Sequence, residues 1–426
     1  LLYQSLVSAR GGARYLKFFQ RELDRTPTNF EPFASVIVPC RGMDQGLREN
    51  LSALFRQDYP RYELIFVADS EDDPALKIVE QLIWGFAREL AAADSSGHAR
   101  VERKRVANVS ARIIVAGRAK DCGQKVHNLR ATVREVEPAC EAFVFVDSDA
   151  RPRPDWLRSL VAPLADETVG AATGYRWFVP VRGRLASTLR AVWNASIVSA
   201  LGEDTRRNFC WGGSTAIRRA TFERLNVLDE WRGALSDDYA LTRALQRARL
   251  PIKFVPACLT ATHEDCTWRE LFEFTTRQLK ITRVYAPHLW LIVLVSNLLF
   301  CLVFYGGILI TSARALRGLP FALPLALIAA IFFLGALKAH LRLRAVAQVL
   351  AREGVRLGVG ARVAHLSLWM VTSVIYLLNA LAAAFSRRIT WRGISYELKS
   401  HAETVIIARE DETGASHNSS HHSRHD

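Results

Sequence analysis

Two aspartates follow a hydrophobic run in the middle of the sequence. The run Ala142-Phe-Val-Phe-Val146 is typical of a buried strand and leads directly into Asp147-Ser-Asp149. Ligands of α/β sheets bind at the carboxyl ends of the strands, so both carboxylates are expected at such an edge. Carboxylates two residues apart can hold Mg²⁺ or Mn²⁺ together with phosphate oxygens, because these hard cations prefer oxygen ligands and leave room for substrate. A polar turn after a strand is the other interpretation.

The elements that must position these aspartates form an alternating pattern. Short β-branched runs alternate with amphipathic helical stretches from about Ser35 to Pro256. This alternation predicts an α/β domain with a mainly parallel sheet. The predicted strands are Ser35–Pro39, Glu63–Val67, Arg112–Val115, Ala142–Val146 and Ile252–Val255.

The second half of the sequence contains apolar segments of membrane-spanning length. Leu289–Ile310 and Leu366–Phe385 are uncharged and long enough to cross a bilayer. Leu319–Leu337 is predicted as a third span, although Pro320 and Pro324 also suit a kinked span or a re-entrant arm. The sequence therefore predicts transmembrane helices after the α/β domain, over residues 289–385.

The distribution of basic residues bears on orientation. Lys338–Arg362 interleaves arginines with aliphatic residues, which fits an interfacial helix and equally a solvated basic loop. The positive-inside rule places the α/β domain in the cytosol, so we expect a multi-pass membrane protein, as in a bacterial inner membrane. Three spans would leave the tail, residues 386–426, outside, whereas Arg387-Arg388 favours the cytosol, so its side stays open. From about Thr404 onward the tail is predicted to be disordered.

The composition agrees with a two-part chain. Of 426 residues, 50% are hydrophobic and 23% charged, which is too apolar for an ordinary soluble enzyme and too charged for a membrane bundle. The net charge of +14, without zinc-finger spacing or an RNA-binding signature, favours anionic lipid and phosphate-bearing substrates over nucleic acid. Seven scattered cysteines indicate reduced, mostly buried thiols. The start Leu1-Leu2-Tyr3 suggests that residues 1–30 follow an N-terminal anchor that is not included.

Several motifs together resemble family 2 glycosyltransferases of the GT-A fold, a Rossmann-like fold. Their order and spacing agree over about two-thirds of the chain, in the segments Ala34–Arg41, Gly46–Pro60, Glu63–Asp69, Gly123–Leu129, Phe145–Asp149, Asn208–Arg218 and Ser236–Leu241. Within that family, Asp72-Asp-Pro-Ala75, the lysine of Gln124–Leu129 and Asp237-Asp-Tyr239 resemble the ceramide glucosyltransferase branch, which includes hopanoid-associated bacterial relatives.

The resemblance implies an activity and its partners. A GT-A domain over residues 31–288 would transfer a single sugar, with inversion, from a UDP-sugar, UDP-glucose being the first choice. The acceptor would be a hydroxyl of a membrane lipid, ceramide-like or other, and the cofactor Mg²⁺ or Mn²⁺. The partners would be the donor, the lipid acceptor and the bilayer, with no nucleic acid; the oligomeric state is left open.

The resemblance also assigns roles at the donor site. Asp69 matches the aspartate that contacts uracil or ribose, a role that Asp72 or Asp73 would take if the loop is shifted. Pro39 and Arg41 belong to the same donor-binding set.

The diphosphate of the donor requires a metal or fixed cations. Asp147 and Asp149 match the pair that binds metal and diphosphate. Lys125, in a loop after a glycine, would offer a point charge to the phosphates; an exposed solubilising lysine is the other interpretation.

The acidic pair Asp237-Asp238 supplies the expected general base. Asp238 matches the aspartate that removes the acceptor proton in the family, and Asp237 stands where many members have glutamate. An inverting displacement needs such a carboxylate opposite the departing diphosphate. Acidic residues also cap helix starts, and both roles are compatible.

One family motif is altered before the first span. Where the family has Gln or Arg, two residues, then Arg-Trp, this chain has Phe274-Thr-Thr-Arg-Gln278. Arg277, Lys280 and Arg283 still provide cations at helical spacing. Either Arg277 is the motif arginine, with Phe274 and Gln278 in place of Gln/Arg and Trp, or Gln278 opens the motif and the Arg-Trp pair is absent. Arg277, Gln278 and Arg283 are expected to bind donor; the alternative is the basic collar of any membrane protein.

Two aromatic segments complete the candidate residues. Trp211, Gly212 and Gly213 are expected on the acceptor side, where glycines let the backbone approach the sugar; a buried tryptophan in a core loop is the alternative. Ile389–Tyr396 resembles a segment that often follows the last span in the family, and an interfacial anchor is a sufficient explanation for it.

Three other functions fit parts of the pattern. A processive polysaccharide synthase shares the aspartates but needs more helices for a polymer channel. A polyprenyl-phosphate sugar transferase differs only in its acceptor. A non-catalytic membrane scaffold would have no need to keep Asp147, Asp149 and Asp238.

Overall fold

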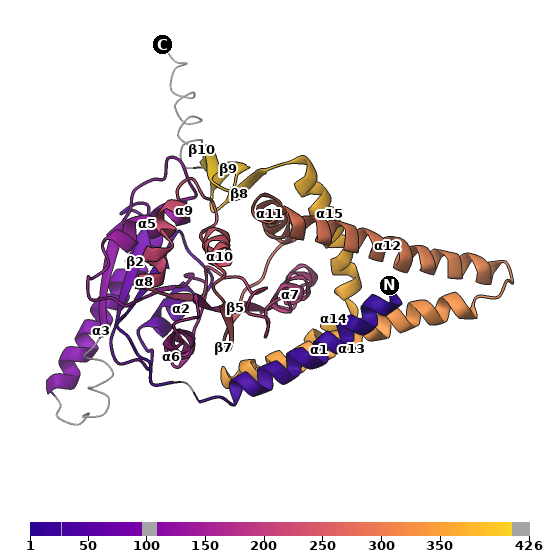
Figure 1. The fold of residues 1–426 in the computed structure, drawn as a ribbon, viewed down its shortest axis with the longest axis horizontal. Coiled ribbons are helices and arrows are strands. Elements are labelled where there is room, and N and C mark those ends of the chain that lie inside the picture. The colour runs from indigo at the N-terminus through magenta and orange to yellow at the C-terminus, as the bar shows by residue number, and fades with distance from the viewer. Residues whose placement is uncertain (27, 96–108, 411–426) are drawn as a thin grey trace, which may run out of the picture. The chain divides into compact units, whose positions relative to one another are not determined.

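The computed structural model describes residues 1–26, 28–95 and 109–410, drawn in Figure 1. The chain divides into two compact units, each built from segments that are distant in sequence. The helical unit comprises Leu1–Thr26, Arg176–Asp204 and Ala261–Phe385, and the α/β unit comprises Pro27–Tyr175, Thr205–Thr260 and Ser386–Asp426.

The α/β unit is built on a mostly parallel sheet, as predicted. Within the described residues, seven strands form it in the order β3-β2-β1-β4-β6-β5-β7. Strands β3, β2, β1 and β4 are parallel to one another, whereas β6 is antiparallel to β4 and β5. The bounds are β1 (Ala34–Pro39), β2 (Tyr62–Ala68), β3 (Val109–Val115), β4 (Ala142–Phe145), β5 (Ala171–Val179), β6 (Thr215–Arg218) and β7 (Ile252–His263). The sequence did not predict β5 and β6.

Both faces of this sheet are covered, which explains the apolar runs within its strands. In β1, Val36 and Val38 belong to one hydrophobic core and Ile37 to the other, because successive side chains point to opposite faces. The first core also contains residues from α2 (Leu47–Leu54), α3 (Pro74–Ser95) and α6 (Trp156–Val161). The second contains residues from α5 (Gln124–Arg134), α8 (Arg219–Arg224) and α10 (Asp237–Arg247).

The parallel strands end side by side at one edge of the sheet. Pro39 at the end of β1 is in register with Val67 of β2, and Ile37 is in register with Phe145, the last residue of β4. The loops that follow β1, β2 and β4 therefore leave the sheet at the same edge, where α/β proteins bind ligands.

The helical unit contains the apolar helices. Its helices are α1 (Leu2–Leu23), α7 (Leu185–Val198), α11 (Trp268–Tyr285), α12 (Pro287–Leu316), α13 (Ala322–Arg352), α14 (Val359–Ser367) and α15 (Trp369–Phe385). Helix α1 packs along α13, and α15 packs against α11 and α12 (Figure 1).

Among the described residues, α12 and α13 are long and apolar enough to cross a membrane, judged by length and composition. The pair α14 and α15, bent by 57°, would add a third span if it crosses as one element. Pro320 precedes α13 and Pro324 lies in its first turn, where a missing N–H costs no hydrogen bond. The prolines therefore impose no kink in this span.

The basic segment Lys338–Arg362 is largely helical. Helix α13 continues without a break to Arg352, and Arg342 is buried within the unit. The interpretation as a solvated basic loop is therefore wrong for the part up to Arg352.

The expected tail is ordered as far as Arg409, which corrects the prediction of disorder from Thr404. It forms an antiparallel sheet of β8 (Arg388–Trp391), β9 (Ile394–Ser400) and β10 (Glu403–Arg409). Alternate residues of β9, Ile394, Tyr396 and Leu398, are buried, so this polar-looking stretch has an apolar face. Residues 411–426, also predicted to be disordered, lie outside the described residues.

Candidate active site

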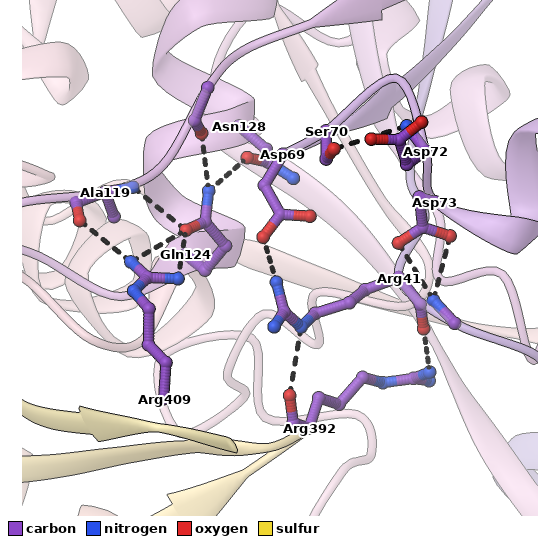
Figure 2. Close-up of polar contacts among 12 residues, drawn as sticks. Arg41, Asp69, Ser70, Asp72, Asp73, Ala119, Gln124, Asn128, Arg392 and Arg409 are labelled. Carbon is purple, nitrogen blue, oxygen red and sulfur yellow. Dashed lines mark hydrogen bonds and ion pairs between the residues drawn. The ribbon is translucent and has the colours of Figure 1, made fainter. Parts of the chain in front are cut away.

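Residues from the loops after β1 and β2 meet at the carboxyl edge of the sheet. Arg41 follows β1 and pairs through Nη1 with Oδ2 of Asp69, the first residue after β2 (Figure 2). The Asp69 side chain is 8% exposed and the Arg41 side chain 23%, so the pair lies in a partly closed environment. Pro39, also predicted for the donor site, is the last residue of β1.

Asp73 and Asp72 have local roles in the second loop. The buried Asp73 carboxylate accepts hydrogen bonds from the backbone N–H groups of Gly42, at 3.0 Å, and Ala75, at 2.9 Å. The N–H of the exposed Asp72 donates to Ser70 Oγ at 3.2 Å. Asp69 is paired with Arg41, whereas the contacts described for Asp72 and Asp73 are with backbone N–H groups and Ser70. Contact of Asp69 with a nucleoside stays a prediction.

Lys125 connects the two acidic motifs. Its Nζ lies 2.8 Å from Oδ1 of Asp147 and 3.3 Å from Oδ1 of Asp237. Burial by itself lowers the pKa of Lys125, but the carboxylates of Asp147, Asp237 and Asp238 outweigh this effect and raise it above its usual value. Lys125 therefore remains charged among carboxylates, and the interpretation as an exposed solubilising lysine is wrong.

The placement of Lys125 depends on a glycine. Lys125 lies in the first turn of α5, not in a loop as predicted, and Gly123 is the N-cap residue. A Cβ on Gly123 would lie 2.6 Å from the backbone oxygen of Leu235, close to the start of α10. Only glycine lets the start of α5 approach the start of α10 this closely, and this approach brings Lys125 to Asp237.

The acidic pair begins α10, but its two members differ in environment. Asp237 is buried, whereas Asp238 is half-buried. The Asp238 carboxylate accepts hydrogen bonds from Ser236 Oγ, from Tyr239 N–H at 2.8 Å and from Gly212 N–H at 3.3 Å. Ser236 is the N-cap residue of the helix, and its hydroxyl also accepts from Tyr239 N–H at 3.4 Å.

The Asp237 carboxyl group titrates at an unusual pH. Burial raises its pKa from 3.8 to about 6; Lys125 opposes the increase, and Asp238 and Asp147 add to it. The folded protein therefore binds the proton of Asp237 more tightly than the unfolded chain does. The protonated Asp237 contributes to the free energy of unfolding in full below pH 3.8, and this contribution is lost as the pH rises through about 6.

We therefore expect Asp237→Asn to remove this pH dependence. The unchanged protein should lose stability between about pH 4 and pH 7, and the variant should not. The difference in thermal unfolding midpoint should therefore shift in favour of the variant over this range, by the equivalent of about 2–3 kcal/mol, since one pKa unit corresponds to about 1.4 kcal/mol. The measurement is thermal unfolding in detergent without donor. Asp229→Asn, at an exposed residue of α9 (Val227–Glu230), is the control. A pH-independent difference between Asp237→Asn and the unchanged protein would contradict this assignment.

Asp147 and Asp149 have the chemistry of a divalent-cation site completed by substrate. Both side chains are half-buried at the end of β4. Within the part of the chain that the structure describes, no group of three or more His, Cys, Asp or Glu side chains is arranged to hold a metal. Mg²⁺ is commonly bound by one or two carboxylates plus substrate phosphates, so the pair fits such an ion without a full protein cage.

The segment Trp211–Gly213 packs against the charged pair. A Cβ on Gly212 would lie 2.6 Å from both Asp237 Oδ2 and Lys125 Nζ, so the backbone here touches the ion pair. A Cβ on Gly213 would overlap the indole of Trp211, which is buried 5.3 Å from the ring of Tyr175. The two glycines are thus required by packing, and contact with the acceptor stays a prediction.

The predicted cationic residues before the first span lie on α11, in the helical unit. Arg283 donates to the backbone oxygen of Ala383 and lies 5.4 Å from the ring centre of Trp290. Arg277 lies over the ring of Phe274 at 5.6 Å. Both arginines therefore have contacts within the helical unit, and donor binding by Arg277, Gln278 and Arg283 stays a prediction.

Sequence reasoning missed two residues next to the aspartates. Asp44, in the loop after β1, accepts a hydrogen bond from Ser148 Oγ at 2.7 Å, and Ser148 separates Asp147 from Asp149. Arg392, between β8 and β9, donates to Asp44 Oδ1 at 2.8 Å. The available signal was the dipeptide Arg392-Gly393 between two alternating runs, which is hairpin-turn spacing.

Curated relatives include ceramide glucosyltransferases. The chain is 22% identical to ceramide glucosyltransferase 1 of Caenorhabditis elegans over 61% of its own length and 52% of that protein. It is 34% identical to the ceramide glucosyltransferase of Komagataella phaffii over 16% of its own length and 13% of that protein. The chain thus spans about half the length of the first of these relatives and less of the second.

Similar solved structures are glycosyltransferases as well. A mannosyltransferase from Pyrobaculum calidifontis, in complex with GDP-Man and Mn²⁺, is 19% identical, covering 90% of this chain and 99% of that chain with a TM-score of 0.42. Glucosyl-3-phosphoglycerate synthase from Mycobacterium tuberculosis, in complex with Mn²⁺ and UDP-Glc, is 16% identical, covering 59% and 78% with a TM-score of 0.36.

The family profile matches almost the whole chain. Residues 3–97 and 99–404 match the profile of glycosyl transferase family 21, a range that includes both units and the hairpin of β8 and β9. The resemblance to ceramide glucosyltransferases is confirmed by this match and by the relatives. The chain belongs to glycosyl transferase family 21.

Proposed function

We propose that this protein is an inverting, metal-dependent glycosyltransferase that moves one sugar from a UDP-sugar to a hydroxyl of a membrane lipid. UDP-glucose is the donor of first choice and a ceramide-like lipid the acceptor, in line with the named relatives. The proposal includes a multi-pass protein in the membrane with the α/β unit on the cytosolic side, because the basic segments favour that side.

The observation that carries the proposal is the bridge that Lys125 makes between the two acidic motifs. Its Nζ is 2.8 Å from Asp147 and 3.3 Å from Asp237, so the Asp147–Asp149 motif and the Asp237-Asp238 pair lie within one small volume. Transfer of a sugar from a nucleoside diphosphate needs charge stabilisation at the leaving group and a base at the acceptor. These two requirements correspond to the two motifs.

The reaction is a single displacement at the anomeric carbon. The acceptor oxygen forms a bond to C1 of the sugar, the bond from C1 to the diphosphate oxygen breaks, and UDP leaves with the electron pair. The proton of the acceptor hydroxyl goes to Asp238. Lys125 stabilises the negative charge that develops on the diphosphate. Asp147 and Asp149 would hold a divalent cation, which when bound would supply Lewis-acid stabilisation of the same charge.

The environments of the two acids favour Asp238 over Asp237 as the base. The Asp237 side chain is 5% exposed and ion-paired with Lys125, which keeps it from an incoming hydroxyl. Asp238 is half-buried, and three hydrogen-bond donors fix its orientation. A fixed carboxylate that substrate can reach is what general-base catalysis requires.

Analysis of the product tests this function. Purified protein in detergent with UDP-glucose, Mn²⁺ and ceramide should yield a lipid carrying one added hexose by mass spectrometry, together with stoichiometric UDP. The same assay with a polyprenyl phosphate, and with no added lipid, provides the comparison. A ladder of hexose adducts would favour a polysaccharide synthase, and a product only with the polyprenyl phosphate would change the acceptor class.

A further inference from the structure

The C-terminal hairpin carries an arginine in an unusual backbone conformation. Trp391 pairs with Ile394, which leaves Arg392-Gly393 as a two-residue turn with φ of 49° and 73°. This turn favours Asn-Gly or Asp-Gly, because both central residues need positive φ. An arginine there is strained by about 1–2 kcal/mol, and such strain persists when other contacts maintain it.

Hydrogen bonds of both the side chain and the backbone of Arg392 hold this residue against the loop after β1. Its guanidinium donates from Nη1 to the backbone oxygen of Arg41 at 2.6 Å, and its own backbone oxygen accepts from Arg41 Nε at 2.9 Å (Figure 2). Nη2 donates to Asp44, which in turn accepts from Ser148. Arg392 is thus hydrogen-bonded to Arg41, the partner of Asp69, and is connected through Asp44 to Ser148 of the Asp147–Asp149 motif.

The rest of this sheet is anchored on α5. The backbone N–H of Gln124, the residue before Lys125, donates to Tyr396 Oη at 3.2 Å. Arg409 donates to the backbone oxygen of Ala119 at 2.9 Å and to Gln124 Oε1 at 3.3 Å (Figure 2). The segment therefore contacts both the loop after β1 and the start of the helix that carries Lys125.

The Arg392 guanidinium is paired with Asp44, whose carboxylate is hydrogen-bonded to Ser148, the residue between Asp147 and Asp149. Burial lowers its pKa, but the carboxylates of Asp44, Asp149 and Asp147 outweigh this effect and raise the pKa above its usual value. The side chain still keeps 35% of its exposure. A guanidinium presents several N–H groups in one plane, which matches the oxygens of a phosphate.

We propose that Arg392 is a donor-binding residue and that its guanidinium contacts the diphosphate of the nucleotide-sugar. The hairpin of β8 and β9 is then part of the donor site, and its strained turn places the cation against Asp44, which is hydrogen-bonded to Ser148 of the Asp147–Asp149 motif. This inference rests on the proposed function, since it takes the ligand at these aspartates to be a nucleoside diphosphate.

The test compares three substitutions at Arg392 with a matched control. Arg392→Gly removes the guanidinium and suits the positive φ, so it separates loss of the cation from loss of folding. Arg392→Gln removes only the charge, and Arg392→Lys restores a cation without the fork. Arg388→Gln alters an arginine of the same hairpin, one that lies 3.9 Å from Glu397.

We expect Arg392→Gly and Arg392→Gln to raise the Kd of UDP with Mn²⁺, and the KM of the UDP-sugar, by about 10–100-fold, the loss of about 1.4–2.7 kcal/mol of binding. kcat should change by less than about threefold, Arg392→Lys should recover part of the affinity, and Arg388→Gln should match the unchanged protein. Uridine binding should be equal in all proteins. The thermal unfolding midpoint of Arg392→Gly should stay close to that of the unchanged protein, because relief of the strain at positive φ offsets the loss of the hydrogen bonds to Arg41 and Asp44.

Each contrary outcome has one meaning. Unchanged UDP affinity in Arg392→Gly overturns the inference. An equal loss of UDP affinity in Arg388→Gln overturns it as well, and so does a loss of UDP affinity in Arg392→Gly that is accompanied by a lower unfolding midpoint. If the unchanged protein binds UDP but transfers no sugar, the proposed function fails while the binding comparison still decides the role of Arg392. If it binds no nucleoside diphosphate, both proposals fail together.

Discussion

Removal of divalent cations is expected to reduce sugar transfer by at least about 10²–10³-fold, because the diphosphate would lose the ion that Asp147 and Asp149 are proposed to hold. Lys125 is one fixed cation near these carboxylates, and Asp147 and Asp237 already share its charge. It therefore cannot by itself neutralise both the aspartates and a bound diphosphate. The measurement is UDP release from UDP-glucose in excess chelator, followed by addition of Mn²⁺ or Mg²⁺.

Substitutions at the aspartates connect this effect to the site. Asp149→Asn should raise the Mn²⁺ concentration for half-maximal activity, and Asp147→Asn should in addition weaken donor binding, because it also removes the 2.8 Å partner of Lys125. Asp155→Asn, a few residues further along and paired with Arg153 at 3.1 Å, should keep the metal response of the unchanged protein. Full activity in excess chelator would contradict metal dependence, and equal metal responses in Asp149→Asn and Asp155→Asn would place the ion elsewhere.

The parallel part of the fold was predictable because both faces of the sheet are buried. Strands β1, β2 and β4 each contain a run of apolar residues, followed soon after the strand by polar residues, and such runs are visible in a sequence. The antiparallel strands β5 and β6 were missed, since β6 has four residues and β5 begins with the small residues Ala171 and Ala172. Their pairing follows from tertiary contacts that local patterns do not contain.

The candidate site was predictable where acidic residues directly follow a strand or begin a helix. Asp69 and Asp147 could be found in this way, and so could the acidic start of α10. The place of Arg392 could not, because it lies 351 residues from Arg41 in the sequence and reaches it only through the β8–β9 hairpin. Contacts between such distant segments leave no periodic signal in either segment.

Replacing Asp238 with asparagine should lower kcat by about two to four orders of magnitude, the usual contribution of a general base, and leave the Kd of UDP with Mn²⁺ nearly unchanged. Asparagine keeps the size of the side chain but cannot take the proton of the acceptor hydroxyl. Its amide also replaces one of two carboxylate oxygens that accept from Ser236, Tyr239 and Gly212. Some loss of local order is therefore expected, and unfolding of the variant should be measured with its kinetics.

Comparison with Asp237→Asn separates catalysis from this structural cost. Asp237 is the buried neighbour on the same helical turn and is paired with Lys125, so its substitution disturbs the site without removing the proposed base. If Asp237→Asn lowers kcat more than Asp238→Asn, the base is Asp237, and the residue matched to the base of the family was wrong by one position. If neither substitution changes kcat, the pair serves only the start of α10, and proton removal must depend on another group. A loss of kcat confined to Asp238→Asn, with UDP affinity retained, identifies Asp238 as the base, because donor binding does not require its proton transfer.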